Sequence, residues 1–271
     1  MDNVFLNEAL KRLLNLPTHP VAVKYIETFD EDVEWELADL GFYRPKNPVN
    51  LCQGVGLARH HGRKVLLAAE DMACIIGAAA GGLHPFDKTL ASGEIGVKDG
   101  IRFNPELCRE LFETLPRIEH GEVEAVAFAP LKEMPLEFDQ VILYGTPLEM
   151  LKVITAYLYD RGARLDMSTC AKYGVCVEGM ASCYNSGELT VGFPCRGERV
   201  SSMVQDHEIY VTVPSEHVET VVKGLEETRH LLPSPMPFGG VDQEPSFLPD
   251  YYLTEVSKGR MGRKSQASTP S

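Results

Sequence analysis

The sequence predicts an α+β fold in which two β-β-α units lie in a mixed sheet packed with helices. Segments 139–158 and 206–225 align with each other when Pro147 is set against Pro214. Each segment contains a strand followed by an amphipathic helix, and another apolar strand precedes each one. An N-terminal portion of helices and strands, with two cysteines at helix starts, completes the predicted fold.

The start of the helix defines the first unit. A strand at 140–144 ends just before Thr146, which is a good N-cap. Pro147 follows as the first helical residue, and Glu149 is the acid of a capping box. The earlier strand of this unit is predicted at 123–129.

The second unit repeats this order. A strand at 208–213 is followed by Pro214, which opens the helix, and Glu216 falls where Glu149 does in the first unit. The earlier strand is predicted at 189–193. The segment between the two units, 161–187, is rich in Gly, Ser and Cys, so we expect an ordered functional loop or a short helix there.

The N-terminal part has its own alternation of helices and strands. Apolar periodicity predicts a helix at 5–14, a strand at 21–26, a helix from Asn50, a strand at 64–68 and a Gly/Ala helix near Met72.

The composition indicates one globular domain. The chain has 271 residues, of which 44% are hydrophobic, so it can bury a full core and lies near the upper limit for one domain. We therefore expect a single α+β domain over residues 1–258. Residues 259–271 are polar and basic, which is typical of a disordered tail.

Charge and hydropathy exclude several classes of protein. A formal net charge of −13 disfavours nucleic acid or an anionic membrane as partner, because phosphate binding depends on clustered Lys and Arg. Residues 1–16 lack the basic and apolar regions of a secretory signal, and the longest apolar run, 72–83, is too short to cross a membrane. We expect a soluble cytoplasmic protein, as a monomer or a homo-oligomer.

Seven cysteines then need an explanation other than disulfides, which are rare in a reducing compartment. Cys52 follows Asn50, which with Gln53 forms a predicted capping box, so its thiol lies in the first turn of a helix. Cys74 follows Asp71, the predicted N-cap of the Gly/Ala helix. A helix start favours a thiolate, although a small buried core residue explains either cysteine alone equally well.

Cys195 lies where the chain leaves a predicted strand through a Pro/Gly turn. Arg196 and Arg199 flank it, and cationic neighbours of this kind lower a thiol pKa and can bind an anionic cofactor. Ion pairs with surface carboxylates explain each arginine equally simply. Thiolates around an oxidised cluster core carry net negative charge, so helix starts and arginines suit such a site.

Spacing alone identifies no metal. Five, six and eleven residues separate Cys170, Cys176, Cys183 and Cys195, which matches neither a zinc ribbon nor the compact ferredoxin pattern. The chain also lacks the GxGxxG, P-loop, HExxH and GxSxG motifs, which sets aside the corresponding nucleotide-binding, zincin and serine hydrolase classes.

Several short stretches together resemble an uncharacterised prokaryotic family, the domain of unknown function 169 (DUF169), over about residues 14–232. They are PVAVK at 20–24, LCQ at 51–53 with AR at 58–59, DMAC at 71–74, CVE at 176–178 and PCRGER at 194–199.

The resemblance implies a cytoplasmic protein of anaerobic bacteria and archaea in which Cys52, Cys74, Cys176 and Cys195 form a recurring set. As ligands they imply an iron-sulfur cluster, such as a 4Fe-4S cluster. Cys183 or Cys170 could replace Cys176 as the fourth ligand. The resemblance supplies no reaction.

Three functions are consistent with these features. The first, which we favour, is a redox or metallocofactor protein, an oxidoreductase if it catalyses a reaction, with an electron-transfer partner or a small-molecule substrate. The second is a metal-free thiol enzyme with Cys195 as nucleophile and Arg196 or Arg199 orienting an anionic substrate. The third is a non-catalytic accessory module in which the cysteines only fill the core.

Overall fold

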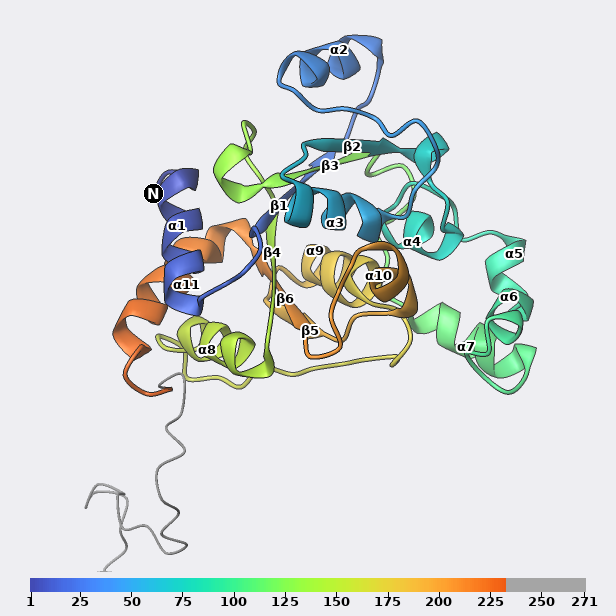
Figure 1. Cartoon of the computed structure of the whole chain (residues 1–271). Helices are drawn as coiled ribbons and strands as arrows, with labels where there is room; N and C mark the ends of the chain where they lie inside the picture. The colour runs from blue at the N-terminus through green and yellow to red at the C-terminus, as the bar shows by residue number, and fades with distance from the viewer. Residues whose placement is uncertain (233–271) are drawn as a thin grey trace, which may run out of the picture. The chain divides into compact units, whose positions relative to one another are not determined.

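A six-stranded sheet with strand order β2-β3-β1-β4-β6-β5 forms the centre of the molecule (Figure 1). The computed structural model describes residues 1–232. The strands are β1 (Val21–Ile26), β2 (Val65–Ala68), β3 (Ala125–Pro130), β4 (Gln140–Gly145), β5 (Thr190–Gly192) and β6 (Ile209–Pro214).

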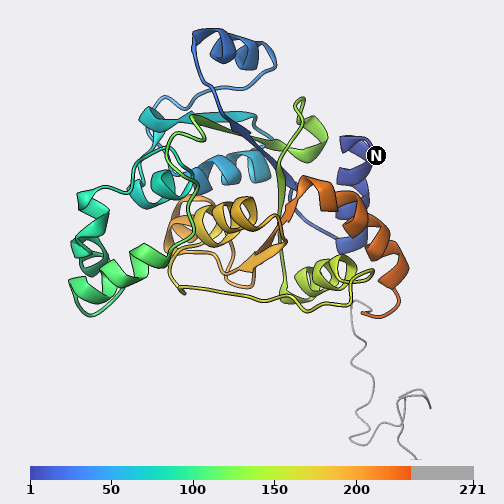
Figure 2. The same ribbon diagram turned by 180° about the vertical axis from the view of Figure 1, so that it is seen from behind.

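Helices cover both faces of the sheet (Figures 1 and 2). The α-helices are α1 (Asn3–Leu14), α2 (Glu31–Asp39), α3 (Leu51–His61), α4 (Ile75–Ala80), α5 (Lys88–Ala91), α6 (Glu94–Lys98), α7 (Pro105–Thr114), α8 (Pro147–Tyr157), α9 (Ser182–Ser186), α10 (Arg196–Ser201) and α11 (Ser215–Thr228). Short 3₁₀ helices occupy Ala69–Asp71 (η1) and Leu131–Glu133 (η2), and a π-helix, η3, spans Val175–Ala181.

The α+β class is confirmed, but the predicted mixed sheet is wrong. Every neighbouring pair of strands in the sheet is antiparallel. The reason lies in how the two β-β-α units meet. Their equivalent strands β4 and β6 pair directly, with Gln140 opposite Pro214 and Tyr144 opposite Tyr210, so the two units face each other in opposite directions.

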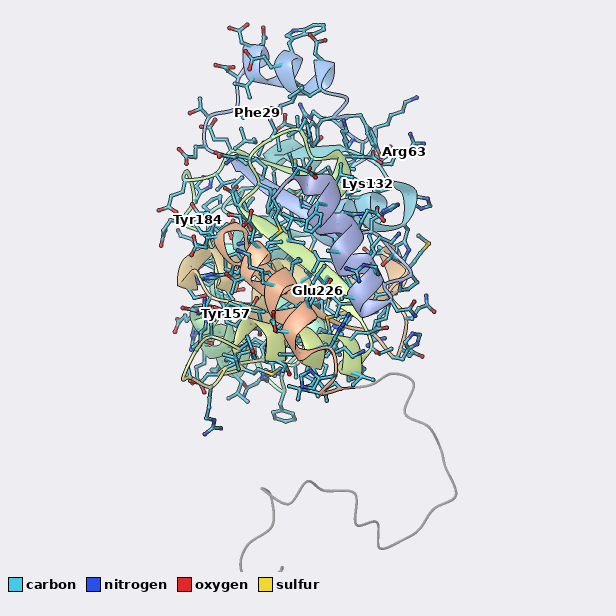
Figure 3. The ribbon with its side chains drawn as sticks, turned by 90° about the vertical axis from the view of Figure 1, so that its left-hand side faces the viewer. Phe29, Arg63, Lys132, Tyr157, Tyr184 and Glu226 are labelled. Carbon is cyan, nitrogen blue, oxygen red and sulfur yellow. The ribbon has the colours of Figure 1, made fainter. Side chains whose placement is uncertain are left out.

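The sheet divides the hydrophobic core into two layers, because successive side chains of a strand point to opposite faces. On β1, Val21, Val23 and Tyr25 join the core under α3 and α4, whereas Ala22 joins the core under α1, α8 and α11. Figure 3 looks onto the second face, where α1 and α11 lie side by side. Arg12 of α1 pairs there with Glu226 of α11 at 2.5 Å.

The predicted helix start of the first unit is confirmed. Thr146 is the N-cap of α8, the Glu149 carboxylate accepts the Thr146 N–H at 2.6 Å, and Pro147 is the first helical residue. In the second unit the cap is Pro214 itself and α11 begins one residue later, at Ser215. The helices α2 at 31–39 and α5 to α7 within 88–114 were not predicted from the sequence.

The predicted tail at 259–271, and the part of the predicted domain after residue 232, lie outside the described residues. Within residues 1–232, no helix has both the length and the apolar character that a membrane crossing requires.

Candidate metal centre

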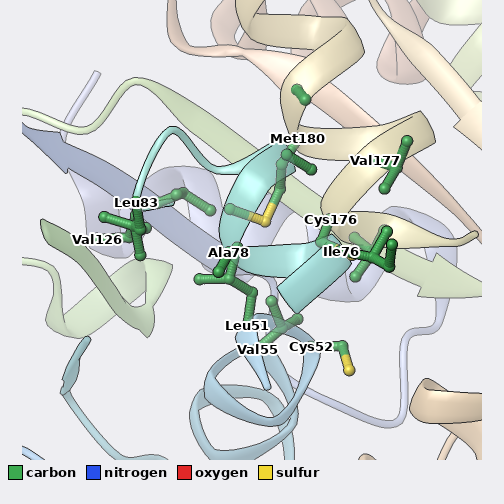
Figure 4. Packing of buried hydrophobic residues seen from close by; sticks show 14 of the residues in the cluster. Leu51, Cys52, Val55, Ile76, Ala78, Leu83, Val126, Cys176, Val177 and Met180 are labelled. Atoms are coloured by element: carbon green, nitrogen blue, oxygen red, sulfur yellow. The ribbon is translucent and has the colours of Figure 1, made fainter. Parts of the chain in front are cut away.

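Four cysteines line one cavity of about 420 Å³ on the α3 side of the sheet. They are Cys52, Cys74, Cys176 and Cys195, which are separated by as many as 143 residues of sequence. The other lining residues are Asn50, Leu51, Ile76, Gly77, Lys98, Asp99, Lys172, Tyr173, Arg196 and Gly197. Figure 4 shows Cys52, Ile76 and Cys176 on three different elements around α4.

Cys52 is the second residue of α3 and is buried. The predicted start of this helix is confirmed, since Asn50 is the N-cap and its N–H donates to Gln53 Oε1 at 2.9 Å. The helix lies close against the sheet at Gly54, where a Cβ atom would come within 2.9 Å of both Phe128 and Leu67. Only glycine allows this approach, which fixes the position of Cys52 over the sheet.

Cys74 is itself the N-cap of α4, and its Sγ accepts the Gly77 N–H at 3.4 Å. The prediction that Asp71 caps this helix is therefore wrong. The Asp71 carboxylate instead accepts the Ala68 N–H at 2.8 Å and pairs with Arg44 at 2.9 Å, which holds the turn of η1 ahead of the cysteine.

Cys195 is the N-cap of α10, a third cysteine at a helix start that sequence reasoning placed only in a turn. Its backbone N–H donates to the carboxylate of Glu198 at 2.8 Å. The helix is packed against α3, because Ser202 Oγ donates to the carbonyl oxygen of Cys52 at 2.7 Å. This contact joins the C-terminal end of α10 to the first turn of α3, which carries Cys52.

Cys176 comes from the π-helix η3, within the segment expected to be a functional loop or a short helix. Single-turn π-helices are uncommon and frequently occur at functional sites. Glu198 also fixes this element, because its carboxylate accepts the Val175 N–H at 3.1 Å.

Distances from the positions of two glycines to the nearest sulfur atoms show which thiols lie near each other. A Cβ at Gly197 would lie 3.5 Å from Cys195 Sγ and 3.6 Å from Cys52 Sγ. A Cβ at Gly77 would lie 3.7 Å from Cys176 Sγ and 3.8 Å from Cys74 Sγ. Each of these two glycines thus lies near a pair of thiols. Even so, within residues 1–232 no three Cys, His, Asp or Glu side chains gather closely enough to hold a single metal ion.

Comparison with known proteins identifies the family. The model of the DUF169 family, described as "Uncharacterised ArCR", matches residues 9–224. The chain belongs to this family.

Similarity to a curated relative extends over most of both chains. The chain is 26% identical over 236 residues to "Uncharacterized protein MJ0308" of Methanocaldococcus jannaschii, a match that covers 85% of this chain and 98% of the relative. No solved structure matches the chain significantly. The resemblance found in the sequence is therefore confirmed, and the candidate centre lies in a DUF169 fold.

Electrostatics in the cavity favour neutral thiols. Burial raises the pKa of Cys52 and of Cys176, and the neighbouring thiolates raise both further. Burial and the Glu198 carboxylate raise the pKa of Cys195 to about 11. The prediction that flanking arginines lower this pKa is wrong, because the shift is upward and is caused by burial and the Glu198 carboxylate.

The two predicted cofactor-binding arginines differ in position. Arg196 lines the cavity. Arg199 does not; its guanidinium donates to Asp206 at 3.0 Å and to the Gln205 carbonyl oxygen at 3.4 Å, on the exposed side of α10. The surface ion pair considered for each arginine is found for Arg199.

The three remaining cysteines lie outside the cavity lining, and none of the seven forms a disulfide. Cys183 is buried on α9, and Cys108 is buried on α7, against Gly96. Cys170 is half-buried, and its Sγ accepts the Tyr173 N–H at 3.3 Å. Of the cysteines considered for the fourth position, the structure places Cys176 with the other three.

Sequence reasoning did not single out Glu198, Lys98, Lys172 or Tyr173. Glu198 had a signal, since it lies three residues after Cys195, as the acid of a capping box does. The other three come from the end of α6 and from the loop before η3, and no local sequence pattern indicates that these two segments approach each other.

Proposed function

We propose that Cys52, Cys74, Cys176 and Cys195 hold an iron-sulfur cluster, which the protein uses to transfer electrons or to transform a small molecule. The observation that carries this proposal is that four thiols from four separate elements line one cavity. Disulfides do not account for them, and the remaining cysteines are dispersed. An oxygen-sensitive centre on reduced thiols suits the cytoplasm.

Charge supports a cationic occupant. Because burial and mutual repulsion raise the pKa of Cys52 and Cys176, the thiolates form readily only if positive charge enters the cavity. Coordination to a metal deprotonates a thiol outright. The iron atoms of a cluster would supply this charge to all four cysteines together.

A single metal ion and a cluster require different arrangements of the thiols. In a tetrahedral zinc site with bonds of about 2.3 Å, the sulfur atoms are roughly 3.8 Å apart. The four thiols are not gathered in this way. In a cluster each thiolate binds a different iron atom, so the sulfur atoms surround the core at wider separations.

A metal-free thiol enzyme receives less support. A nucleophilic cysteine requires a lowered pKa or an adjacent base. The pKa of Cys195 is instead raised to about 11, and Arg199, one of the two arginines assigned to orient its substrate, pairs with Asp206.

Anaerobic purification from an iron-replete host tests the proposal. We expect a brown protein with about four iron and four sulfide per chain, and an electron paramagnetic resonance signal after reduction. Replacement of Cys52 or Cys195 by Ser should remove most of the iron.

Cys183→Ser is the matched control, because Cys183 is equally buried but lies outside the cavity lining; this variant should keep its iron. A colourless wild-type protein without iron would contradict the proposal. Unchanged stability and partner binding after the joint replacement of Cys52, Cys74 and Cys195 by Ala would indicate the accessory module instead.

A further inference from the structure

The cavity that holds the four thiols has a second chemical character away from the sulfur atoms. Its lining includes three cationic side chains, Lys98, Lys172 and Arg196, and one carboxylate, Asp99. The Asn50 amide adds a further donor. The protein as a whole has a net charge of −13, so this local excess of positive charge runs against the composition of the chain.

Arg196 is free to bind an external group. It forms no ion pair with any of the described residues, although it is exposed at the cavity, whereas Arg199 on the same helix pairs with Asp206. A guanidinium presents a planar set of donors that matches a carboxylate or a phosphate. Its position beside Cys195 places these donors next to the thiol cavity.

Lys172 joins the loop before η3 to the C-terminal end of α6. Its ammonium group donates to the carbonyl oxygen of Asp99 at 3.2 Å. This bond uses one of three ammonium protons, so two remain for another acceptor. Lys98 precedes Asp99 in the chain and lines the same cavity.

Tyr173 belongs to the cavity lining, but its hydroxyl is closed off from the open part of the cavity. This hydroxyl is buried and has no hydrogen-bond partner among the described residues. A buried polar group of this kind is costly to the folded state. Of the buried side-chain atoms without partners in residues 1–232, only this one belongs to a residue that lines the thiol cavity.

We propose that this cavity binds a small organic anion, bearing a carboxylate or a phosphate, between Arg196 and Lys172 and beside the cysteine cluster. This proposal rests on the proposed function, because the anion would be the substrate of the metal centre and would lie next to it. The cavity has a volume of about 420 Å³, which the anion would share with the cluster. Concave walls concentrate the field of the cations at such a ligand.

Titration calorimetry on the anaerobic, iron-loaded full-length protein at low ionic strength tests this proposal. The probes are succinate and inorganic phosphate, with succinamide as the uncharged counterpart of succinate. We expect one of the two anions to bind, succinamide not to bind, and the affinity to fall as salt is added. The anion that binds distinguishes a carboxylate from a phosphate substrate.

Arg196→Gln and Lys172→Gln should each weaken anion binding by about tenfold or more, because each removes a charged donor. Arg199→Gln is the matched control on the same helix and should change binding less than about twofold. Iron content, measured on every variant, should stay at the wild-type level.

Three results would overturn the anion site: no binding of either anion to iron-loaded wild-type protein, equal weakening by Arg199→Gln, or loss of iron in Arg196→Gln and Lys172→Gln. The last result would mean that the cations only balance the charge of the cluster. If the wild-type protein contains no iron but still binds an anion through Arg196, only the metal proposal is refuted. If the wild-type protein binds neither iron nor an anion, both proposals are refuted.

Discussion

The buried carboxylate of Glu198 accepts the backbone N–H of Cys195 at 2.8 Å. The same oxygen accepts the Val175 N–H at 3.1 Å, and the Tyr144 hydroxyl donates to the other oxygen at 2.7 Å. One side chain therefore holds the backbone at two of the four cysteine-bearing elements. Glu198 is not a ligand in our proposal, but it positions two ligands relative to each other.

Glu198→Ala should lower the free energy of unfolding by about 2–5 kcal/mol, because it leaves the buried N–H groups of Cys195 and Val175 without an acceptor. It should also lower iron content. Glu198→Gln should retain most of both, since the amide oxygen can accept the two N–H groups and the amide nitrogen can donate to Tyr144. Urea unfolding and iron analysis of both variants check this, and equal losses in the two would argue against the assigned role.

The pH dependence of stability should also report on Glu198. Burial raises the pKa of this carboxyl above its ordinary value of 4.5, although two N–H groups oppose the shift. The resulting stabilisation is present below pH 4.5 and is lost as the pH rises through the raised pKa. In metal-free protein, the wild type should therefore lose stability relative to Glu198→Gln as the pH rises above 4.5. Parallel urea-unfolding profiles would be inconsistent with this.

Gly197→Val should block the cluster without unfolding the protein. A Cβ at this position lies in ordinary contact with Cys52 Sγ and Cys195 Sγ, at 3.6 and 3.5 Å, and two further methyl groups would add bulk beside these sulfur atoms. We expect most of the iron to be lost and the circular dichroism spectrum to be retained. Gly162→Val is the control, because nothing lies within 4 Å of a Cβ there. Full iron content in Gly197→Val would contradict the placement of the cluster.

Cys195 should react slowly with iodoacetamide at neutral pH in metal-free protein. Its pKa is raised to about 11 by burial and Glu198, so little thiolate is present below that pH. The rate should rise as the pH approaches 11, and stability should fall over the same interval above the ordinary value of 9, because the folded state favours the protonated thiol. Mass spectrometry of labelled peptides measures the rate; rapid labelling of Cys195 at pH 7 would favour the thiol-enzyme alternative.

Glu208→Gln should be strongly destabilising. Glu208 pairs with Arg59, and the two side chains are only 6% and 1% exposed. The guanidinium also lies over the ring of Tyr144, 4.3 Å from its centroid. Loss of the carboxylate leaves a buried cation unpaired, which costs about 3–5 kcal/mol in free energy of unfolding. Glu226→Gln, which breaks the exposed pair with Arg12, should cost less than about 1 kcal/mol by the same measurement; similar losses in both would refute the distinction.

Acid should weaken the same buried pair. Although burial opposes ionisation, the hydrogen bond from Arg59 holds the pKa of Glu208 below its ordinary value of 4.5. This stabilisation is present above pH 4.5 and is lost as the pH falls through the lowered pKa. The wild type should therefore lose its stability advantage over Glu208→Gln below pH 4.5 in urea unfolding. An advantage that is unchanged at pH 3 would contradict this.

Local sequence patterns predicted the parts of the fold that local forces determine. Capping residues such as Asn50 and Thr146 act within one helical turn, so the starts of α3 and α8 could be recognised in the sequence. The antiparallel pairing of β4 with β6 depends on how two distant units face each other. No short segment encodes that relationship, which is why the mixed sheet was a wrong prediction.

Only part of the candidate site could be predicted from the sequence, because the rest also depends on contacts between distant segments. The resemblance to the family implied the four cysteines, and the structure places all four in one cavity. Arg196 and Arg199 could not be distinguished by composition, because the difference lies in which side of a short helix each occupies and in the presence of Asp206. Lys172 reaches the neighbourhood of Lys98 because its ammonium group donates to the carbonyl oxygen of Asp99. This is a tertiary contact, which no local sequence pattern encodes.

The order of the four thiols along the chain has a consequence for biosynthesis. Cys52 and Cys74 precede the first β-β-α unit, whereas Cys176 and Cys195 follow its helix, α8. A nascent polypeptide that has emerged only as far as α8 contains two of the four cysteines. It lacks η3 and α10, which form part of the cavity lining. The cluster that we propose would therefore have all of its ligands only after η3 and α10 have been synthesised.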